Sequence, residues 1–164
     1  MKTLYLVRHA ISSRAIPELK DIDRPLTEKG YSDAHLIAKE LKRRKIKTDL
    51  IVTSHAIRAI STALIFAQAL KYPYRNILIN EKIYSEDFKE ILTFIKEIAP
   101  KYASIMMFGH SPAFEELVNY ISIKKIESFK TSGFICLEAD KNASFEKGSF
   151  NEGFYLFPEY LEKA

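Results

Sequence analysis

The sequence contains one cysteine, no tryptophan and four histidines among its 164 residues. A single cysteine, Cys136, excludes an internal disulfide framework and a zinc site built from several cysteines. No apolar run approaches the roughly 18 residues that a membrane-spanning helix needs, so we expect no membrane association. The apolar stretch near the N-terminus is too short for a secretory signal, which favours a cytoplasmic protein.

Positive charge is only in modest excess, because 25 lysines and arginines face 21 aspartates and glutamates. The resulting net charge of +4, with a pI near 9.0, does not by itself indicate a nucleic-acid partner. Six of the cations and one glutamate fall within residues 39–47, close to the end of a predicted helix. Cations at that position complement the helix dipole, so we interpret this segment as a solvated helix end and expect no nucleic acid.

Two kinds of apolar pattern alternate along the chain. Short buried strands are predicted at residues 4–7, 50–52, 104–108 and 134–137, with a further pair of strands within residues 144–157. Apolar residues spaced as on one face of a helix occur at residues 34–41, 60–67, 88–95 and 114–121. Alternating strands and helices of these lengths predict an α/β fold, a three-layer α/β/α sandwich with a mostly parallel central sheet.

The chain contains no linker, internal repeat or low-complexity tract, so we expect a single domain over residues 1–164. Residues 10–26 have no clear periodicity and predict a long loop. Long loops in compact domains often carry function, so this segment is a candidate part of a site.

Basic side chains follow three of the predicted strands at the point where each ends. Arg8 and His9 follow the first, His55 and Arg58 the second, and His110 the third. Ligands of open α/β sheets bind outside the carboxyl ends of the strands, so we expect these side chains to form a site. Guanidinium groups match phosphate oxygens and imidazoles serve as nucleophiles or acid–base groups, which favours an anionic substrate. We expect no metal, because the arginines repel cations and no HxH or HxxxH pair is present.

Four segments in order then carry a family resemblance. Residues 6–10 (LVRHA) resemble the LxRHG/A signature of the histidine phosphatase superfamily, and residues 24–30 (RPLTEKG) resemble its R-P-L-T-x-x-G segment. Residues 54–63 (SHAIRAISTA) resemble its S-P-x-x-R-A-x-x-T-A segment, and residues 109–112 (GHSP) its GHxP segment. The short length and the RPL form are most similar to the SixA-type phosphohistidine phosphatases, within the phosphoglycerate-mutase-like fold.

The resemblance implies a two-step mechanism without a metal or another cofactor. His9 would attack phosphorus and become phosphohistidine, which water then hydrolyses. Arg8, Arg58 and His110 would hold the phosphoryl oxygens and neutralise the charge of the transition state. Arg24 and Ser54 are expected to bind the substrate.

The chain departs from the family pattern at several positions. His55 stands where proline is usual; as a hypothesis it adds an ionisable group that changes the pH dependence, against the plainer interpretation of a helix-start residue without a catalytic role. His35 is interpreted as a surface or boundary residue. In the loop after the first strand, Arg14 stands where many relatives have tryptophan, and either touches substrate or, as we favour, lies in solvent.

The general acid is not evident from the motifs. Glu81 and Glu86 are the possible general acids, with Asp87 as a further carboxylate in the same segment. A phosphoramidate leaves as an imidazole that needs no dedicated protein acid, so a weak acid favours phosphohistidine over phosphate esters.

We therefore predict a cofactor-independent phosphatase that acts on phosphohistidine in a protein. The alternatives are a phosphatase of small phosphomonoesters from the same superfamily, and a non-catalytic module that binds phosphoproteins. We expect a phosphohistidine-containing protein or a small phosphorylated molecule as the partner, and a monomer or weak homodimer.

Overall fold

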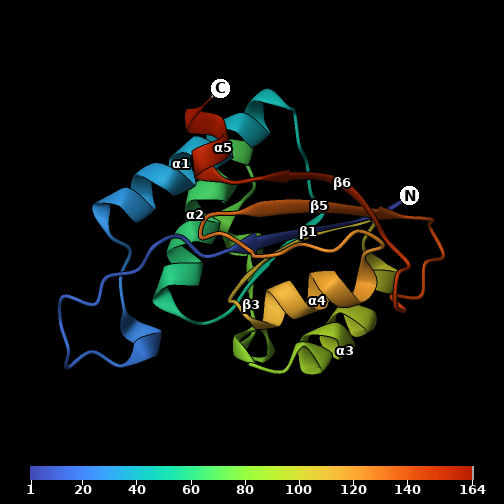
Figure 1. Cartoon of the computed structure of the whole chain (residues 1–164), viewed down its shortest axis with the longest axis horizontal. Coiled ribbons are helices and arrows are strands. Elements are labelled where there is room, and N and C mark those ends of the chain that lie inside the picture. Colours follow the sequence, from blue (N-terminus) through green and yellow to red (C-terminus); the bar gives the residue numbers. More distant parts are fainter. Residues whose placement is uncertain (164) are drawn as a thin grey trace.

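The computed structural model describes residues 1–163, in which one sheet carries helices on both faces (Figure 1). The strands are β1 (Lys2–Arg8), β2 (Leu50–Thr53), β3 (Leu78–Ile79), β4 (Ser104–Gly109), β5 (Phe134–Ala139) and β6 (Asn151–Leu156), in the order β3-β2-β4-β1-β5-β6. The pairs β3–β2, β2–β4 and β4–β1 are parallel, whereas β5 runs antiparallel to both β1 and β6. The predicted α/β class with a mostly parallel central sheet is confirmed.

The helices divide between the two faces of the sheet. They are α1 (Glu28–Arg43), α2 (Ile57–Leu70), α3 (Phe88–Ile98), α4 (Ala113–Ile121) and α5 (Pro158–Glu162), with 3-10 turns η1 (Asp21–Asp23), η2 (Tyr74–Asn76), η3 (Glu81–Tyr84) and η4 (Ala99–Lys101). Figure 1 shows α1, α2 and α5 over one face, and α3 and α4 over the other. Within residues 1–163, no helix is both long and apolar enough to cross a lipid bilayer.

Alternation along β1 builds two cores, one on each face of the sheet. Leu4 and Leu6 pack with the apolar stripes of α3 and α4, while Tyr5 and Val7 pack with those of α1 and α2. This is the period of two that a strand imposes, because successive side chains point to opposite faces. With helices on both faces, β1 is buried along most of its length, which explains why it appears in the sequence as a continuous apolar run.

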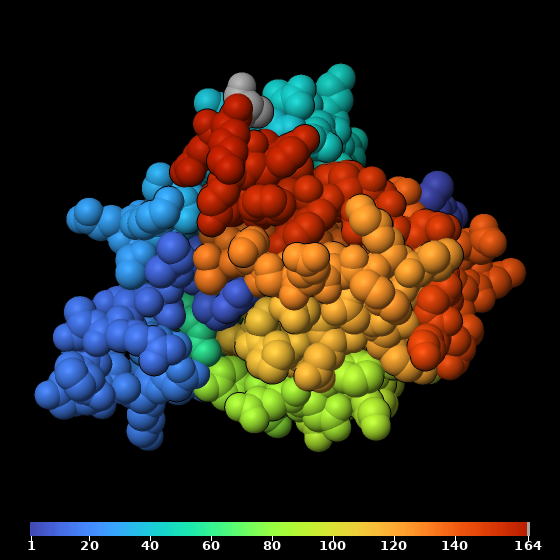
Figure 2. Space-filling model, viewed as in Figure 1, coloured from blue at the N-terminus to red at the C-terminus, as the bar shows by residue number. Residues whose placement is uncertain are grey.

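The predicted loop at residues 10–26 lacks regular structure except for η1 and an isolated bridge between Ser12 and Leu26. It stands out from the rest of the surface in Figure 2, where it is blue. The helix after it begins at a side-chain cap, because Thr27 Oγ1 accepts a hydrogen bond of 2.9 Å from the Gly30 amide.

The prediction of a pair of strands within residues 144–157 is wrong in part, because only one strand forms there. Residues 151–156 form β6, but residues 144–150 form turns and coil. Phe145 and Gly148 have φ angles of 57° and 67°, in the left-handed region, so the backbone turns there instead of extending. The aromatic residues that suggested a strand are nevertheless buried, since the rings of Phe145 and Phe150 lie 4.9 Å apart.

Candidate active site

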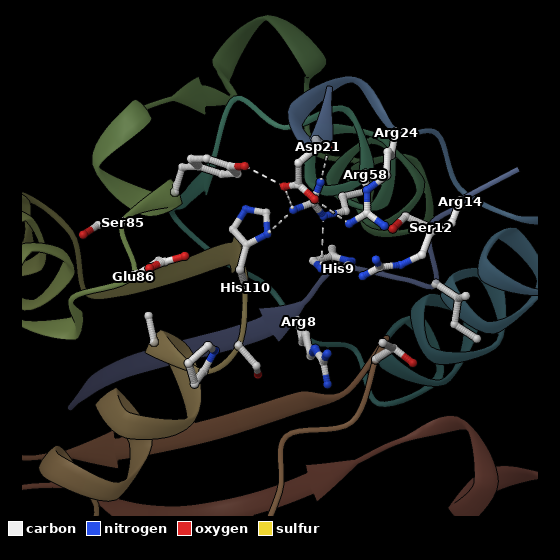
Figure 3. Close-up of a pocket in the computed structure, with 16 residues that line it drawn as sticks. Arg8, His9, Ser12, Arg14, Asp21, Arg24, Arg58, Ser85, Glu86 and His110 are labelled. Atoms are coloured by element: carbon white, nitrogen blue, oxygen red, sulfur yellow. Dashed lines mark hydrogen bonds and ion pairs between the residues drawn. The ribbon is translucent and has the colours of Figure 1, made fainter. Parts of the chain in front are cut away.

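The carboxyl ends of β1, β2 and β4 meet at one edge of the sheet, and the expected basic residues gather there (Figure 3). Arg8 pairs in register with Gly109, so His9 and His110 follow neighbouring strands, and their rings lie 5.1 Å apart. They border a cavity of about 600 Å³. Its walls include Arg8, His9, Ser12, Arg14, Asp21, Arg24, Arg58, Tyr84, Glu86, His110, Ser111 and Thr131.

The turn from β4 into α4 depends on glycine at position 109. A Cβ atom there would lie 2.4 Å from the ring of Phe114, which is fully buried. Without a side chain at Gly109, the backbone runs directly against that ring, and the next residue, His110, reaches the cavity. A larger residue would have to displace either the ring or the loop that carries the histidine.

His9 is buried and is held in one orientation. Its Nδ1 lies 2.7 Å from the Ala10 carbonyl oxygen, which can only accept, so Nδ1 carries the proton and Nε2 carries the lone pair. The Ala10 amide in turn donates to Thr62 Oγ1 at 3.0 Å. Burial, together with the nearby charge of Arg58, lowers the pKa of His9 to about 4. At neutral pH this histidine is therefore uncharged and has the electronic state of a nucleophile.

His110 is held from both sides of its ring. Nε2 lies 2.6 Å from Ser54 Oγ, and Nδ1 lies 3.4 Å from Arg58 Nη2. An arginine can only donate, so Nδ1 is the acceptor and Nε2 donates to the Ser54 hydroxyl. Burial, followed by the charges of His9 and Arg58, lowers the pKa of His110 to about 3. Ser54 is fully buried and does not line the cavity, so its contact orients His110 rather than reaching a ligand.

Two of the arginines have buried donors that no group uses within residues 1–163. Arg8 donates from Nη1 to the Phe129 carbonyl oxygen at 2.6 Å, while its Nε has no partner. The Nε of Arg24 is also buried and without a partner in this part of the chain. Buried donors without acceptors are costly, and both side chains line the cavity, so the two arginines are candidates to bind an anion there.

Arg58, the second residue of α2, contacts both the candidate nucleophile and a carboxylate. Its Nε donates to His9 Nε2 at 3.2 Å. Its Nη1 and Nη2 donate to the backbone oxygen and to Oδ2 of Asp21, at 2.5 and 2.8 Å. Asp21 Oδ1 also accepts from Arg24 Nη2 at 2.7 Å, and Oδ2 accepts from the Tyr84 hydroxyl at 2.6 Å. Sequence reasoning missed Asp21 and Tyr84; the one local signal was an aspartate three residues before Arg24 in the long loop.

The structure separates the candidate general acids. Glu86 lines the cavity, whereas Glu81, at the start of η3, lies outside it and borders a separate depression with His55. Asp87 is the N-cap of α3, where Oδ1 accepts from the Lys89 amide at 2.9 Å. Of the three predicted carboxylates, only Glu86 is therefore placed to reach a ligand.

Arg14 and His55 occupy different positions relative to the cavity. Arg14 is exposed, yet it lines the cavity, and Figure 3 shows its side chain directed toward Arg8 and His9. His55 does not line the cavity; its ring packs edge-on against Tyr84 at 5.2 Å, and Tyr84 packs edge-on against His110 at 5.1 Å. His35 is exposed on α1. Within the described part of the chain, no three His, Cys, Asp or Glu side chains are grouped to hold a metal ion.

A family model describes more than half of the chain. Residues 4–91 match the model of the histidine phosphatase superfamily, branch 1. This match includes Arg8, His9, Arg24 and Arg58, and it ends before His110. The evidence for His110 is therefore its position beside His9 in the structure.

Individual relatives match over nearly the whole chain. An uncharacterized protein of Picosynechococcus sp. is 29% identical over 164 residues, which cover 96% of this chain and 98% of the relative. The structure of a SixA protein from Agrobacterium tumefaciens superposes with a TM-score of 0.83 at 26% identity, covering 96% of this chain and 98% of that one. The protein histidine phosphatase SixA complexed with tungstate superposes with a TM-score of 0.84 at 20% identity, covering 97% and 99%, which shows a shared fold.

Proposed function

The chain belongs to the histidine phosphatase superfamily, branch 1, and is accordingly a phosphatase; we propose that His9 is its nucleophile and that phosphohistidine in a protein is its substrate. The observation that carries the proposal is the state of His9. Its Nδ1 donates to a backbone oxygen, and its Nε2 lone pair lies at a cavity bordered by arginines. A neutral imidazole in that orientation is ready to attack an anionic phosphoryl group.

In the first step, His9 Nε2 attacks phosphorus, an Nε2–P bond forms, and the bond from phosphorus to the leaving group breaks. Arg8 and Arg58 bind the phosphoryl oxygens and balance the charge that spreads over them, while His110, held by Ser54 and Arg58, borders the phosphoryl site. Arg24 lines the same cavity and is a further donor for these oxygens. In the second step, a water oxygen attacks phosphorus, the Nε2–P bond breaks, and inorganic phosphate leaves.

The carboxylates of the cavity support a phosphohistidine substrate. Asp21 is ionised, because hydrogen bonds from Tyr84 and Arg58 hold its pKa well below the usual range of a carboxyl group, so it is not a proton donor at neutral pH. Glu86 is then the candidate acid, on an exposed turn. A phosphohistidine leaves as imidazole, which needs less help from an acid than an alkoxide does. The 26% identical structural relative carries the name SixA, in agreement with this substrate class.

The nucleophile is tested by comparing two histidine substitutions. His9→Ala is expected to abolish hydrolysis of a phosphorylated histidine phosphotransfer domain and of p-nitrophenyl phosphate, with a loss of about a thousandfold or more. His35→Ala makes the same chemical change on the exposed side of α1 and should leave both rates within twofold. Rapid quenching of the wild type followed by mass spectrometry should find an acid-labile phosphoryl group on His9. Wild-type rates in His9→Ala would refute the mechanism, and wild type inactive on both substrates would favour a binding module.

The substrate class is tested by comparing two glutamate substitutions. Glu86→Gln should slow hydrolysis of a phosphoserine ester by about tenfold or more, while phosphohistidine hydrolysis changes little. Glu81→Gln lies outside the cavity and should change neither rate. Equal turnover of the ester and of phosphohistidine by the wild type would instead identify a phosphatase of small phosphomonoesters.

A further inference from the structure

Asp21 brings a negative charge into a cavity that is lined by four arginines and one other carboxylate, Glu86. Its carboxylate receives hydrogen bonds from three different segments: Arg58 on α2, Arg24 after η1, and Tyr84 at the end of η3. Each carboxylate oxygen has its own arginine, at 2.7 Å for Oδ1 and 2.8 Å for Oδ2. Figure 3 shows Asp21 beside Arg58 and Arg24, with His9 below them in this view.

These contacts determine which edge of the Arg58 guanidinium faces the nucleophile. Of the two outer nitrogens, Nη1 donates to the backbone oxygen of Asp21 and Nη2 donates to its carboxylate. Nε is then directed at His9 Nε2, 3.2 Å away, and Nη2 also lies 3.4 Å from His110 Nδ1. Because a guanidinium is planar, holding its outer edge sets the direction of every remaining N–H bond.

The depth of the side chains indicates that Asp21 is required to keep Arg58 there. The Arg58 side chain is 6% exposed, and the other oxygen of the same carboxylate bonds a like-charged group, Arg24. A buried guanidinium without a counter-ion is strongly unfavourable, so Arg58 without Asp21 would be expected to turn toward water. Its Nε would then leave the position from which it reaches the phosphoryl oxygens.

We propose that Asp21 is a positioning residue for the phosphoryl-transfer reaction: it holds Arg58 and Arg24 side by side and directs Arg58 Nε toward the atom that attacks phosphorus. Asp21 acts through these arginines and does not bind the phosphoryl group. The kinetic part rests on the proposed function, whereas the orientation of Arg58 is independent of it. Tyr84, which donates to the same oxygen as Arg58, holds the carboxylate in place.

The kinetic test is Asp21→Asn, which keeps the shape of the side chain and removes its charge. Asp23→Asn is the matched control, because it makes the same change in the same 3-10 turn, at an exposed residue that does not line the cavity. With p-nitrophenyl phosphate, Asp21→Asn should lower kcat/KM by about ten- to a hundredfold, chiefly through kcat, since displaced charged groups cost that much. Asp23→Asn should remain within twofold of the wild type. Asp21→Asn within twofold of Asp23→Asn would overturn the proposal.

A second readout does not depend on activity. The Nε–H of Arg58 can be followed by ¹H–¹⁵N NMR and assigned by its loss in Arg58→Lys. In wild type and Asp23→Asn we expect a resolved, slowly exchanging signal, because the proton is buried and bonded to His9. In Asp21→Asn it should exchange with water at least tenfold faster. An unchanged exchange rate in Asp21→Asn would overturn the proposal even for an inactive protein. If the Nε–H of Arg58 exchanges faster in Asp21→Asn but the wild type has no phosphatase activity, Asp21 still orients Arg58 and only the proposed function is refuted.

Tyr84→Phe tests the position of the Asp21 carboxylate with a smaller change, and it serves as the kinetic test if Asp21→Asn does not fold. It removes one hydrogen bond to Asp21 Oδ2 and leaves the ion pairs. A loss of about two- to fivefold in kcat/KM is expected, because Tyr84 donates one hydrogen bond to Asp21 and affects the reaction only through Asp21 and Arg58. Tighter binding of inorganic phosphate to Asp21→Asn, together with a higher kcat/KM, would contradict positioning and show instead that Asp21 competes with the substrate.

Discussion

Two places in this molecule combine one carboxylate with two arginines. At the cavity, Asp21 pairs with Arg24 at 2.7 Å and with Arg58 at 2.8 Å. At the end of α1, Glu40 pairs with Arg43 at 2.7 Å and with Arg44 at 2.6 Å. In both places the arginines lower the pKa of the carboxyl group, for Glu40 to about 2. By charge and distance alone, the two clusters are nearly the same.

The order of burial is reversed between the two clusters. At the cavity the arginine is buried and the carboxylate is open, with Arg58 6% and Asp21 53% exposed. On α1 the carboxylate is the sheltered member, with Glu40 14% and Arg43 71% exposed. A sheltered guanidinium with donors directed inward is able to receive an anion, whereas exposed arginines are already solvated. Depth and direction of the donors, rather than the number of cations, distinguish a site from a charged helix end.

The largest expected contrast is between two single substitutions, Arg58→Ala and Arg43→Ala. Arg58→Ala removes a donor next to the attacking nitrogen and should lower kcat on p-nitrophenyl phosphate by about a hundred- to a thousandfold. Arg43→Ala removes an equal charge from a solvated pair and should leave kcat and KM within twofold. The measurement is kcat and KM of both variants from steady-state kinetics at the same ionic strength. Similar losses in the two would show that net charge, and not the position of Arg58, supports activity.

An intermediate contrast comes from pH, because the cavity cluster adjoins the buried His9 and the half-buried His110, whereas the hydrogen bonds of the α1 cluster within residues 1–163 involve no histidine. Burial and the neighbouring arginines lower the pKa of His9 to about 4. The nucleophile therefore stays neutral well below the ordinary histidine value of 6.5. The acid limb of kcat/KM should lie near pH 4, with a tenfold decrease for each pH unit below it. An acid limb near pH 6.5 that belongs to the free enzyme would contradict this environment for His9.

The same shift makes stability depend on pH, with a definite sign. Between pH 6.5 and about 4 the unfolded chain binds protons at His9 and His110 that the folded protein does not bind. The contribution of these two histidines to the free energy of unfolding should therefore be complete above pH 6.5. It should decrease as the pH is lowered toward 4, by up to about 1.4 kcal/mol per pH unit for each group. Urea unfolding at several pH values checks this. His9→Ala should make the free energy of unfolding depend less steeply on pH, whereas His35→Ala should not.

The smallest expected effect belongs to the α1 cluster. Arg44 pairs with Glu40, and its guanidinium lies 4.8 Å from the ring centre of Phe154 on β6. Arg44→Ala should lower the free energy of unfolding by about 0.5–1 kcal/mol, as expected for a partly exposed cation–π contact and ion pair, and should leave kinetics unchanged. Arg44→Lys, with a compact charge, should restore part of the loss. An effect of Arg44→Ala on kcat would contradict the separation of the two clusters.

Much of the fold was predictable because periodicity is a local property. The apolar run at residues 4–7 lies in β1, and the helical spacing at residues 60–67 lies in α2. The position of Arg8, His9 and His110 at strand ends was also predictable, since parallel strands place their carboxyl ends on one edge. Residues 144–150 were predicted as strand because the segment is rich in aromatic residues, but turns can bury aromatic rings as well as strands do.

The rest of the site could not be predicted from spacing. Tyr84 lies 63 residues from Asp21, and only the packing of η3 against the long loop brings its hydroxyl to the carboxylate. Glu81 and Glu86 looked alike in the sequence, and the turn of η3 directs one away from the cavity and the other into it. Ser54 was expected to bind substrate, yet it is fully buried, bonds to His110 and does not line the cavity.

The sequence by itself determined the layers of the fold, the family, and which strand ends carry Arg8, His9, Arg58 and His110, because these follow from local patterns and motif order. Only the tertiary structure decided which nitrogen of His9 carries the lone pair, that Arg58 Nε faces this nitrogen, and that Asp21 holds the opposite edge of the guanidinium. The physical reason is that these properties depend on burial and on hydrogen bonds between distant segments. A one-dimensional pattern records which groups are present, whereas depth and direction arise when the chain folds.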